Sequence, residues 1–311
     1  MRRLFGRKPS APVRRNQQGK YGPFQGTVSE RGAFVDARRA EFRNRDASRY
    51  RLADELAQRA AFSIPPDQGF AVVPAGSLTK VDEVVRDANQ LIERIGHKKL
   101  TEGKLKGGFM AKGFLPDSAF SLDSPYFRLG LSEEVIAPIA AYLGFVPVLT
   151  EIDVWYSVPG HEAPRSSQLW HLDYADTTQV KVFVHLNDIG AEMGPLTALS
   201  AASSEQLAKE ADYNLGEKVR VPDEALARHA SPEQLVSFEG PTGTADFVDS
   251  SRCFHMGSRV GPGAEPRRLA FFQYLTPYNF EYREGPAGES AYGWLATAGS
   301  SELERLVLGA A

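Results

Sequence analysis

The chain has 311 residues, of which 42% are hydrophobic and 24% are charged, as in an ordinary globular protein. Its one cysteine, Cys253, excludes an internal disulfide, and no run approaches the roughly 20 apolar residues that a membrane-spanning helix needs. The basic N-terminus has no apolar segment of the kind found in secretory signals. These features exclude disulfide scaffolds and membrane-spanning proteins, and we expect a cytoplasmic protein.

The net charge of −3 is unevenly spread along the chain. The first 50 residues hold 13 Lys and Arg against 4 Asp and Glu, a net of +9, so the remaining residues carry −12. Residues 1–25 mix Arg, Pro, Gly and Gln without a period, which predicts a disordered basic tail. Such an arm could touch nucleic acid or an anionic membrane, but the acidic body favours a solvated tail, and we expect no nucleic-acid partner.

The first half of the chain shows helical periodicity. Residues 34–62 predict one or two amphipathic helices, and 69–76 ("GFAVVPAG") a short strand that ends at Pro and Gly. Residues 77–96 place Val, Leu and Ile on one helical face before a glycine stop, and 131–144 predict a further helix with Ser132 as its N-cap.

Residues 99–124 are rich in Gly and Lys and show no clear element. A loop of this length in a compact domain is often a lid or a binding loop. It could line the substrate entrance, where its lysines would suit an anionic substrate, or it could be a mobile surface loop with solvated charges. The lysines concerned are Lys99, Lys104, Lys106 and Lys112.

After about residue 146, short alternating runs such as "TEIDVWYSV" and "QVKVFVHLND" follow one another, punctuated by Gly, Pro and Asp. Many short strands separated by turn residues predict an antiparallel sandwich or barrel. We therefore expect a mostly β protein with flanking α-helices, in one catalytic domain over 26–311. Its parts are a helical region at about 26–145, a β core at about 146–280 and a C-terminal extension at about 281–311.

The stretch "LWHLDYAD" places His171 and Asp173 two positions apart. Composition alone gives close to one His-x-acid pair in such a chain, so the pair carries little weight by itself. On a strand, however, residues i and i+2 share a face, and an imidazole and a carboxylate could bind one cation. A second imidazole would come from His185, whose neighbours suggest a half-buried structural residue, or from His255. Two His and one carboxylate form the facial triad of non-haem Fe(II) oxygenases.

An ordered set of motifs resembles the phytanoyl-CoA dioxygenase family of Fe(II)/2-oxoglutarate-dependent oxygenases. The motifs are "WHLDYAD", "VKVFVHLNDIGAEMGPLTALSAAS", "GTADFVDSSRCFHMGS" and "RRLAFFQY", and the resemblance is strongest from about 150 to 280. It implies a double-stranded β-helix, the jelly-roll core of cupin-like proteins. It also implies Fe(II), 2-oxoglutarate as co-substrate, and O₂.

By this resemblance the catalytic iron ligands are His171, Asp173 and His255. Related halogenases replace the carboxylate by a small residue, so Asp173 argues against halogenation. The segment "LSAASSE" departs from the family's pattern after the Gly-Pro turn, so no contacts of that loop can be carried over.

The far carboxylate of a keto-acid co-substrate needs a cation, and an arginine fork suits it. The strand "RRLAFFQYL" offers Arg267 and Arg268, which face opposite ways, so only one can enter the site. Counting back from Tyr274, the resemblance favours Arg267, whereas a one-residue bulge would favour Arg268. Phe183 falls where the family often places an aromatic against 2-oxoglutarate, and Lys181 shares its face.

Several residues near these motifs also have simpler interpretations. Lys181 could be an ordinary surface lysine and Phe183 a plain core residue. We expect Asp176 in a turn rather than as a partner of the iron ligands, and Trp170 in the core. Cys253 is expected to be a small buried residue, the alternative being a thiol close enough to iron to be oxidised.

The sequence thus predicts an Fe(II)/2-oxoglutarate-dependent dioxygenase that hydroxylates a small-molecule C–H bond and releases succinate and CO₂. One alternative is a non-catalytic or sensing protein on the same fold, which would form no succinate. Another is a cupin-like enzyme that uses a different metal without 2-oxoglutarate and is insensitive to changes in the arginine pair. Family members act on acyl thioesters, osmolytes and natural products, and the fold does not choose among these substrates.

Overall fold

The computed structural model describes residues 28–44, 46–160, 163–211, 213, 220–279 and 292–310. The tail expected to be disordered, 1–25, lies outside these ranges. Within them, no helix combines the length and the apolar composition needed to cross a membrane.

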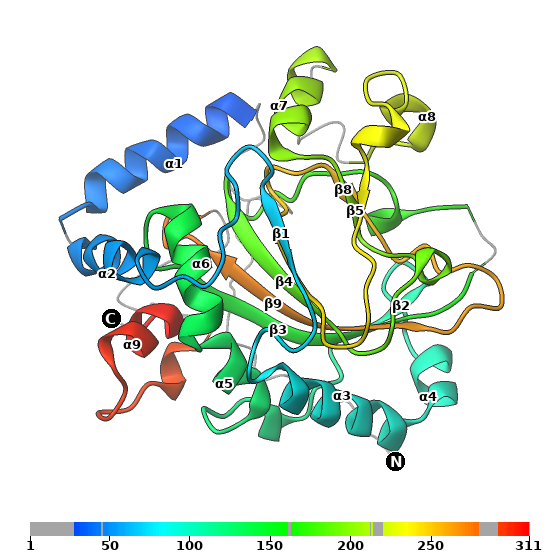
Figure 1. Ribbon diagram of the computed structural model, residues 1–311, viewed down its shortest axis with the longest axis horizontal. Helices are drawn as coiled ribbons and strands as arrows, with labels where there is room; N and C mark the ends of the chain where they lie inside the picture. The colour runs from blue at the N-terminus through cyan, green and yellow to red at the C-terminus, as the bar shows by residue number, and fades with distance from the viewer. Residues whose placement is uncertain are drawn as a thin grey trace.

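Two antiparallel sheets form the centre of the fold (Figure 1). The larger has the order β1-β7-β4-β9-β3-β2, and its strands are β1 Phe70–Val73, β7 Ala245–Asp249, β4 Gln179–His185, β9 Arg267–Leu275, β3 Val148–Ser157 and β2 Met110–Ala111. The smaller has the order β6-β5-β8, and its strands are β6 Val236–Ser237, β5 Thr197–Ala198 and β8 His255–Met256.

The connectivity of these strands is that of a double-stranded β-helix. From β3 onward the chain passes back and forth between the sheets, with β3, β4, β7 and β9 in the larger and β5, β6 and β8 in the smaller. An isolated antiparallel bridge places His171 beside His255 of β8, which adds a fourth segment to the smaller sheet. The predicted mostly β jelly-roll core with flanking helices is therefore confirmed.

The helices cover the larger sheet and the ends of the molecule. They are α1 Val28–Phe42, α2 Ala47–Ala57, α3 Val81–Ile95, α4 His97–Glu102, α5 Pro125–Gly130, α6 Glu133–Leu143, α7 Ala201–Glu210, α8 Asp223–Leu226 and α9 Glu302–Leu308. Short 3₁₀ turns lie at Asp117–Ala119, Ser166–Gln168, Ala191–Met193, Pro232–Gln234 and Gly293–Leu295. In Figure 1, α2, α3, α5 and α6 lie along one side of the larger sheet, and α7 and α8 lie at the opposite side of the molecule.

Strand β4 shows how the sequence directs its two faces. Val180, Val182 and Val184 belong to the largest apolar cluster, together with residues of α3, α5 and α6. Burying each of these valines stabilises the fold by about 1.5–3 kcal/mol. Lys181 and Phe183 alternate with them and face the smaller sheet, where Phe183 joins a second apolar cluster. The space between the sheets is therefore the place where polar side chains of the core can meet.

Some predicted elements differ from the observed ones. The segment 34–62 forms two helices, α1 and α2, and the helix expected over 77–96 begins at Val81 as α3. Ser132 does occupy the N-cap position of α6, but its hydroxyl donates to the carbonyl of Leu129 and caps no N–H of the helix.

The segment 99–124, which shows no clear element in the sequence, contains short ones. It includes the end of α4, a 3₁₀ turn and the short strand β2, which pairs with the edge of β3 through Met110 and Ala111. A strand of two residues is too short to show an alternating pattern, so β2 cannot be predicted from periodicity.

The strand predicted around "WHLDY" is reduced to bridges at Trp170 and His171. The partner strand β8 spans only two residues, and Asp173 donates its N–H to the carbonyl of Ser250 outside any strand. The predicted C-terminal extension, about 281–311, falls partly outside the described residues, and within it α9 packs against β3.

Candidate metal centre and its cavity

Three side chains converge where the smaller sheet meets the larger one. His171, Asp173 and His255 each offer one ligand atom, and these atoms all lie within 4.8 Å of one another. One oxygen of Asp173 lies 3.8 Å from Nε2 of His171, and the other lies 3.5 Å from Nε2 of His255. Atoms bound to one ion at about 2.0–2.2 Å are at most ~4.4 Å apart, so both pairs fit a shared cation.

Backbone pairing brings the two imidazoles together. His171 and His255 exchange both main-chain hydrogen bonds, each 3.0 Å long, as directly opposed residues of antiparallel strands do. Their rings are consequently 4.2 Å apart between centroids. The short strand β8 and the bridge opposite it therefore have the function of placing two histidines.

The backbone also sets which ring nitrogen is available. Nδ1 of His171 lies 2.9 Å from the carbonyl oxygen of Leu169, and Nδ1 of His255 lies 2.9 Å from that of Cys253. A carbonyl can only accept, so each Nδ1 carries the proton and each Nε2 keeps its lone pair. This is the arrangement that orients histidine ligands in metal sites.

Electrostatics keeps the donors in their metal-binding forms. Burial lowers the pKa of His171 well below its ordinary value, and burial also lowers the pKa of His255. Burial alone would raise the pKa of Asp173, but the ammonium of Lys181, 2.5 Å from its Oδ2, helps to bring that pKa well below the usual range. Both imidazoles are thus neutral and the carboxylate is ionised at neutral pH, as metal binding requires.

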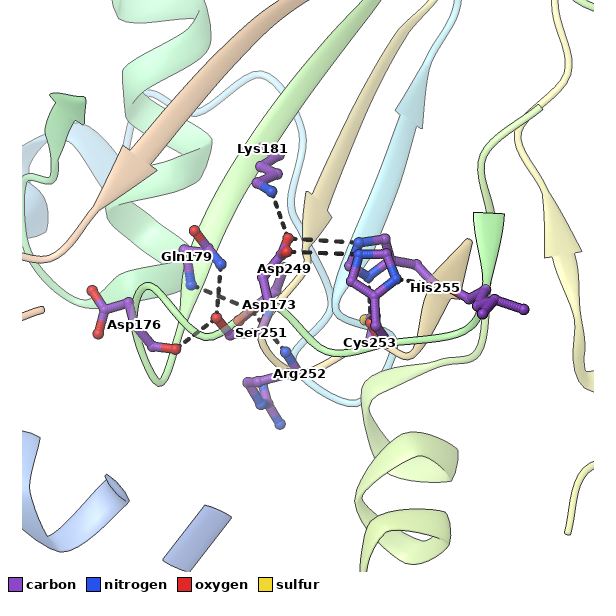
Figure 2. A network of polar contacts seen from close by, with 11 residues as sticks. Asp173, Asp176, Gln179, Lys181, Asp249, Ser251, Arg252, Cys253 and His255 are labelled. Atoms are coloured by element: carbon purple, nitrogen blue, oxygen red, sulfur yellow. Dashed lines mark hydrogen bonds and ion pairs between the residues drawn. The ribbon is translucent and has the colours of Figure 1, made fainter. Parts of the chain in front are cut away.

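A buried carboxylate, Asp249 at the end of β7, ties together the two segments that carry the ligands (Figure 2). It accepts hydrogen bonds of 2.6–3.3 Å from the segment that follows Asp173 and from the segment that precedes His255. The donors are Thr178 Oγ1 and the N–H groups of Gln179, Ser251 and Arg252, with the Tyr142 hydroxyl as a fifth at 2.8 Å. Burial raises the pKa of Asp249, and the bonds from Thr178 and Tyr142 offset part of this rise.

The two arginines of β9 have opposite surroundings. Arg267 is buried and lines the cavity beside the three ligands, where burial lowers its pKa to about 10. Its guanidinium donates to the carbonyl of Gly194 at 2.8 Å and to the Ser258 hydroxyl, and its Nε has no partner within the described residues. Arg268 faces the other way and donates to Asn89 of α3 at 3.2 Å.

The turns that hold Arg267 require unusual backbone. Gly194 has φ of 63°, and a Cβ there would lie 2.5 Å from backbone atoms of Arg259, so only glycine fits. Ser258, whose hydroxyl accepts from Arg267, has φ of 65°. Ser166 has φ of 55°, and these two serines are the only non-glycine residues with positive φ in the described ranges. Both line the cavity, and backbone strain of this kind gathers at functional sites.

The cavity between the sheets has a volume of about 300 Å³. Lys181 and Phe183 of β4 contribute to its wall, and Phe183 packs with Trp155 and Phe271 at centroid distances of 5.7 and 5.5 Å. The Lys181 ammonium lies 5.6 Å from the centre of the Phe271 ring, so an aromatic floor underlies the charged groups.

The residues expected to be structural are indeed buried parts of the scaffold. His185 is 1% exposed, more buried than expected, and its Nε2 lies 2.8 Å from Asp246 Oδ2. Trp170 is a core residue, and Asp176 is buried and accepts from the N–H groups of Thr177 and Thr276. Cys253 is fully buried, and burial raises the pKa of its thiol, as is typical of structural cysteines.

The sequence interpretation missed two contributors to this site. Arg220 lines the cavity from a polar region that shows no period, and Asp249 follows an apolar strand in "DFVDSS". The turn-forming Asp-Ser-Ser run was a signal for Asp249, because Asp side chains accept from nearby backbone N–H groups. Of the four lysines in 99–124, only Lys106 lines the cavity.

Comparison with known proteins gave structural similarities at low identity. No family model matches the chain, and no curated protein matches it, so the resemblance to the phytanoyl-CoA dioxygenase family stays a prediction. The solved epimerase SnoN in complex with Fe³⁺, α-ketoglutarate and nogalamycin RO is 18% identical, over 72% of this chain and 84% of its own, with a TM-score of 0.48.

Two further solved structures are similar. EctD from S. alaskensis with 2-oxoglutarate and 5-hydroxyectoine is 19% identical, over 77% of this chain and 83% of its own, with a TM-score of 0.48. HygX from Streptomyces hygroscopicus with nickel and 2-oxoglutarate bound is 17% identical, over 71% of this chain and 88% of its own, with a TM-score of 0.44. At these values the similarity adds nothing to the chemistry that the geometry of the site itself indicates.

Proposed function

We propose that this chain is an Fe(II)/2-oxoglutarate-dependent dioxygenase of the phytanoyl-CoA dioxygenase type. It would hydroxylate a C–H bond of a small molecule and release succinate and CO₂, in a single catalytic domain over 26–311 and in the cytoplasm. When bound, Fe(II) and 2-oxoglutarate would supply the activation of O₂ that no amino-acid side chain provides.

The proposed metal ligands are Nε2 of His171, Nε2 of His255 and the carboxylate of Asp173. Two nitrogen donors and one oxygen donor suit a first-row divalent ion, and three protein ligands leave coordination positions open for co-substrate and O₂. Lys181 fixes the orientation of the Asp173 carboxylate through its 2.5 Å contact and keeps it ionised.

We assign Arg267 to the C5 carboxylate of 2-oxoglutarate. The support is that, among the described residues, its buried guanidinium contacts no acidic side chain: two of its donors bond to neutral acceptors, and Nε has no partner. A buried guanidinium that lacks a carboxylate is costly, and a bound carboxylate would relieve that cost. Phe183 and Lys181 lie on the same wall and would border the co-substrate, whereas Arg268 points away from the cavity.

One observation carries the proposal more than any other. The Nε2 lone pairs of the two histidines and the Asp173 carboxylate share one space, and a buried arginine that contacts no acidic side chain within the described residues lines the same cavity. A purely structural cluster would not need both a fixed imidazole tautomer and a buried arginine with no acidic side chain in contact.

The test is succinate formation from 2-oxoglutarate by the full chain with Fe(II) and ascorbate. We expect the wild type to release succinate slowly even without substrate. In Asp173→Ala the rate should fall below 1% of wild type, as rates do when an essential active-site residue is removed. His229→Ala changes an exposed histidine outside the site and should leave the rate unchanged. Equal rates in all three proteins would refute the site. Binding of metal and 2-oxoglutarate without succinate would instead indicate the sensing alternative.

A further inference from the structure

We propose that the substrate carries an anionic group, a carboxylate or a phosphate, and that Lys106 at the mouth of the cavity binds it. The inference rests on the proposed function, because it takes the same cavity as the active site. It adds a substrate class and a specificity-determining residue on the segment between α4 and β2.

The first support is the charge balance of the cavity. Its walls include four cationic side chains, Lys106, Lys181, Arg220 and Arg267, against two carboxylates, Glu151 and Asp173. Even with Arg220 left out, the cations exceed the carboxylates by one positive charge, since both metal-ligand histidines are neutral. A divalent metal and a dianionic co-substrate would cancel each other and leave that excess in place. A cleft that stays positive after both have bound attracts an anionic substrate.

The second support is how the cations are partnered. Lys181 pairs with Asp173 at 2.5 Å, and Glu151 pairs with Lys112 at 3.3 Å. Arg267 is held by Gly194 and Ser258. In the described part of the chain, the Lys106 ammonium makes no hydrogen bond and no ion pair, although it faces the same cavity.

The third support is the surface next to Lys106. Its ammonium lies 5.8 Å from the centre of the Trp155 ring, and the ring stacks on Phe271 at 4.2 Å. The Trp155 indole N–H is buried and has no partner within the described ranges. A cation and an unsatisfied N–H donor beside stacked aromatic rings favour a substrate in which an anionic, acceptor-rich group adjoins an apolar part.

The surroundings also make Lys106 responsive to an anion. The residue is exposed at the cavity mouth, so a ligand can reach it. Burial of the ammonium end among the cavity walls, together with the charges of Lys112 and Lys181, lowers the pKa of Lys106 to about 8. A bound anion would stabilise the protonated form, which a pair of neighbouring lysines otherwise disfavours.

A binding experiment tests the inference without any turnover. Thermal unfolding of the full chain is followed with saturating 2-oxoglutarate, so that Arg267 is occupied, and with acetate or inorganic phosphate against chloride at equal ionic strength. We expect either anion to raise the Tm of wild type by about 2–4 °C over chloride. Lys106→Met should lose this rise, and Lys104→Met, which changes an exposed lysine outside the cavity, should keep it. Equal rises in both variants, or none in wild type, would overturn the proposal.

A substrate screen then separates the two sources of negative charge. Succinate release is measured with carboxylic acids and their amides, and with phosphate esters and their alcohols. Stimulation should come from one anionic arm, and Lys106→Met should raise the KM for that compound about 10- to 100-fold, as expected for a lost charged hydrogen bond. The role of Lys106 would be contradicted if the neutral amides or alcohols stimulated succinate release with the same KM in wild type and Lys106→Met. Absence of succinate throughout would count against the proposed function, while the anion-dependent Tm would still decide the role of Lys106.

Discussion

The two walls of the cavity are built differently. The wall from the larger sheet consists of long strands, β3, β4 and β9, paired along seven or more residues and covered by helices. The wall from the smaller sheet consists of two-residue strands, and it carries His171 and His255. The first wall is held by ladder hydrogen bonds and apolar burial, and the second by a few main-chain bonds and a buried carboxylate.

This difference indicates a division of labour. Residues assigned to the co-substrate, Arg267 and Phe183, stand on the long strands, where position follows from strand alternation. The proposed metal ligands stand on short segments, where position depends on polar groups such as Asp249. Changes of His171 or His255 should therefore act on metal binding, and changes of Arg267 or Phe183 on 2-oxoglutarate binding.

The largest expected effect contrasts histidines of the two walls. His171→Ala should weaken binding of Fe(II) or Mn(II) at least 100-fold, measured by anaerobic equilibrium dialysis, because a ligand is removed. His185→Gln should keep the metal affinity and lower the free energy of unfolding by about 1–3 kcal/mol, because it disturbs a buried bond to Asp246. If both variants bind metal equally well, His171 is not a ligand.

The second effect contrasts the two faces of β9. Arg267→Met should raise the Kd for 2-oxoglutarate about 10- to 100-fold, because charged hydrogen bonds to a carboxylate are lost. Arg268→Met removes a guanidinium that bonds to Asn89 and should change the Kd less than twofold. Isothermal titration with Mn(II)-loaded protein measures both. A larger effect at Arg268 would reverse the assignment.

The third effect concerns Asp249 as a positioning residue. Asp249→Asn should weaken metal binding about 10-fold, since loss of groups that orient ligands has such effects in other metal sites. The measurement is the metal Kd at a temperature well below the Tm of the variant, where a merely structural role would leave the Kd unchanged. Asp188→Asn alters an exposed carboxylate that accepts from Thr242 and serves as the matched control. An unaltered Kd in Asp249→Asn would remove Asp249 from the metal centre.

The smallest effect is the pH dependence of anion binding at Lys106. The ammonium binds an anion only when protonated, so acetate-dependent stabilisation should be present at pH 7 and fade as the pH rises above about 8. Burial of the ammonium lowers the pKa of Lys106 most, Lys112 and Lys181 lower it further, and Asp173 and Glu151 raise it.

Lys106→Arg provides the matched comparison for this pH dependence. Arginine stays charged, so this variant should keep the acetate effect at pH 9.5. A wild-type response that does not change between pH 7 and 9.5 would contradict the role of the ammonium.

The sequence predicted the residues on the long strands of the larger sheet better than the structure of the short segments in the smaller sheet. The sequence predicted the two faces of β4, because a long strand shows a clear period of two. Val180, Val182 and Val184 alternate there with Lys181 and Phe183. The opposite orientations of Arg267 and Arg268 followed from the same rule. The short segments left no such trace, so the predicted "WHLDY" strand proved to be bridges. The role of Asp249 and the approach of Lys106 to Trp155 depend on tertiary contacts between segments far apart in the chain.

We propose that one cavity holds a metal and 2-oxoglutarate together. The direct measurement is calorimetric titration of 2-oxoglutarate into metal-free protein and into protein loaded with Mn(II), which is stable to oxidation. We expect one 2-oxoglutarate per chain, with binding at least 10-fold tighter in the Mn(II)-loaded protein than in the metal-free protein. The same affinity with and without metal, or no binding in either, would contradict it.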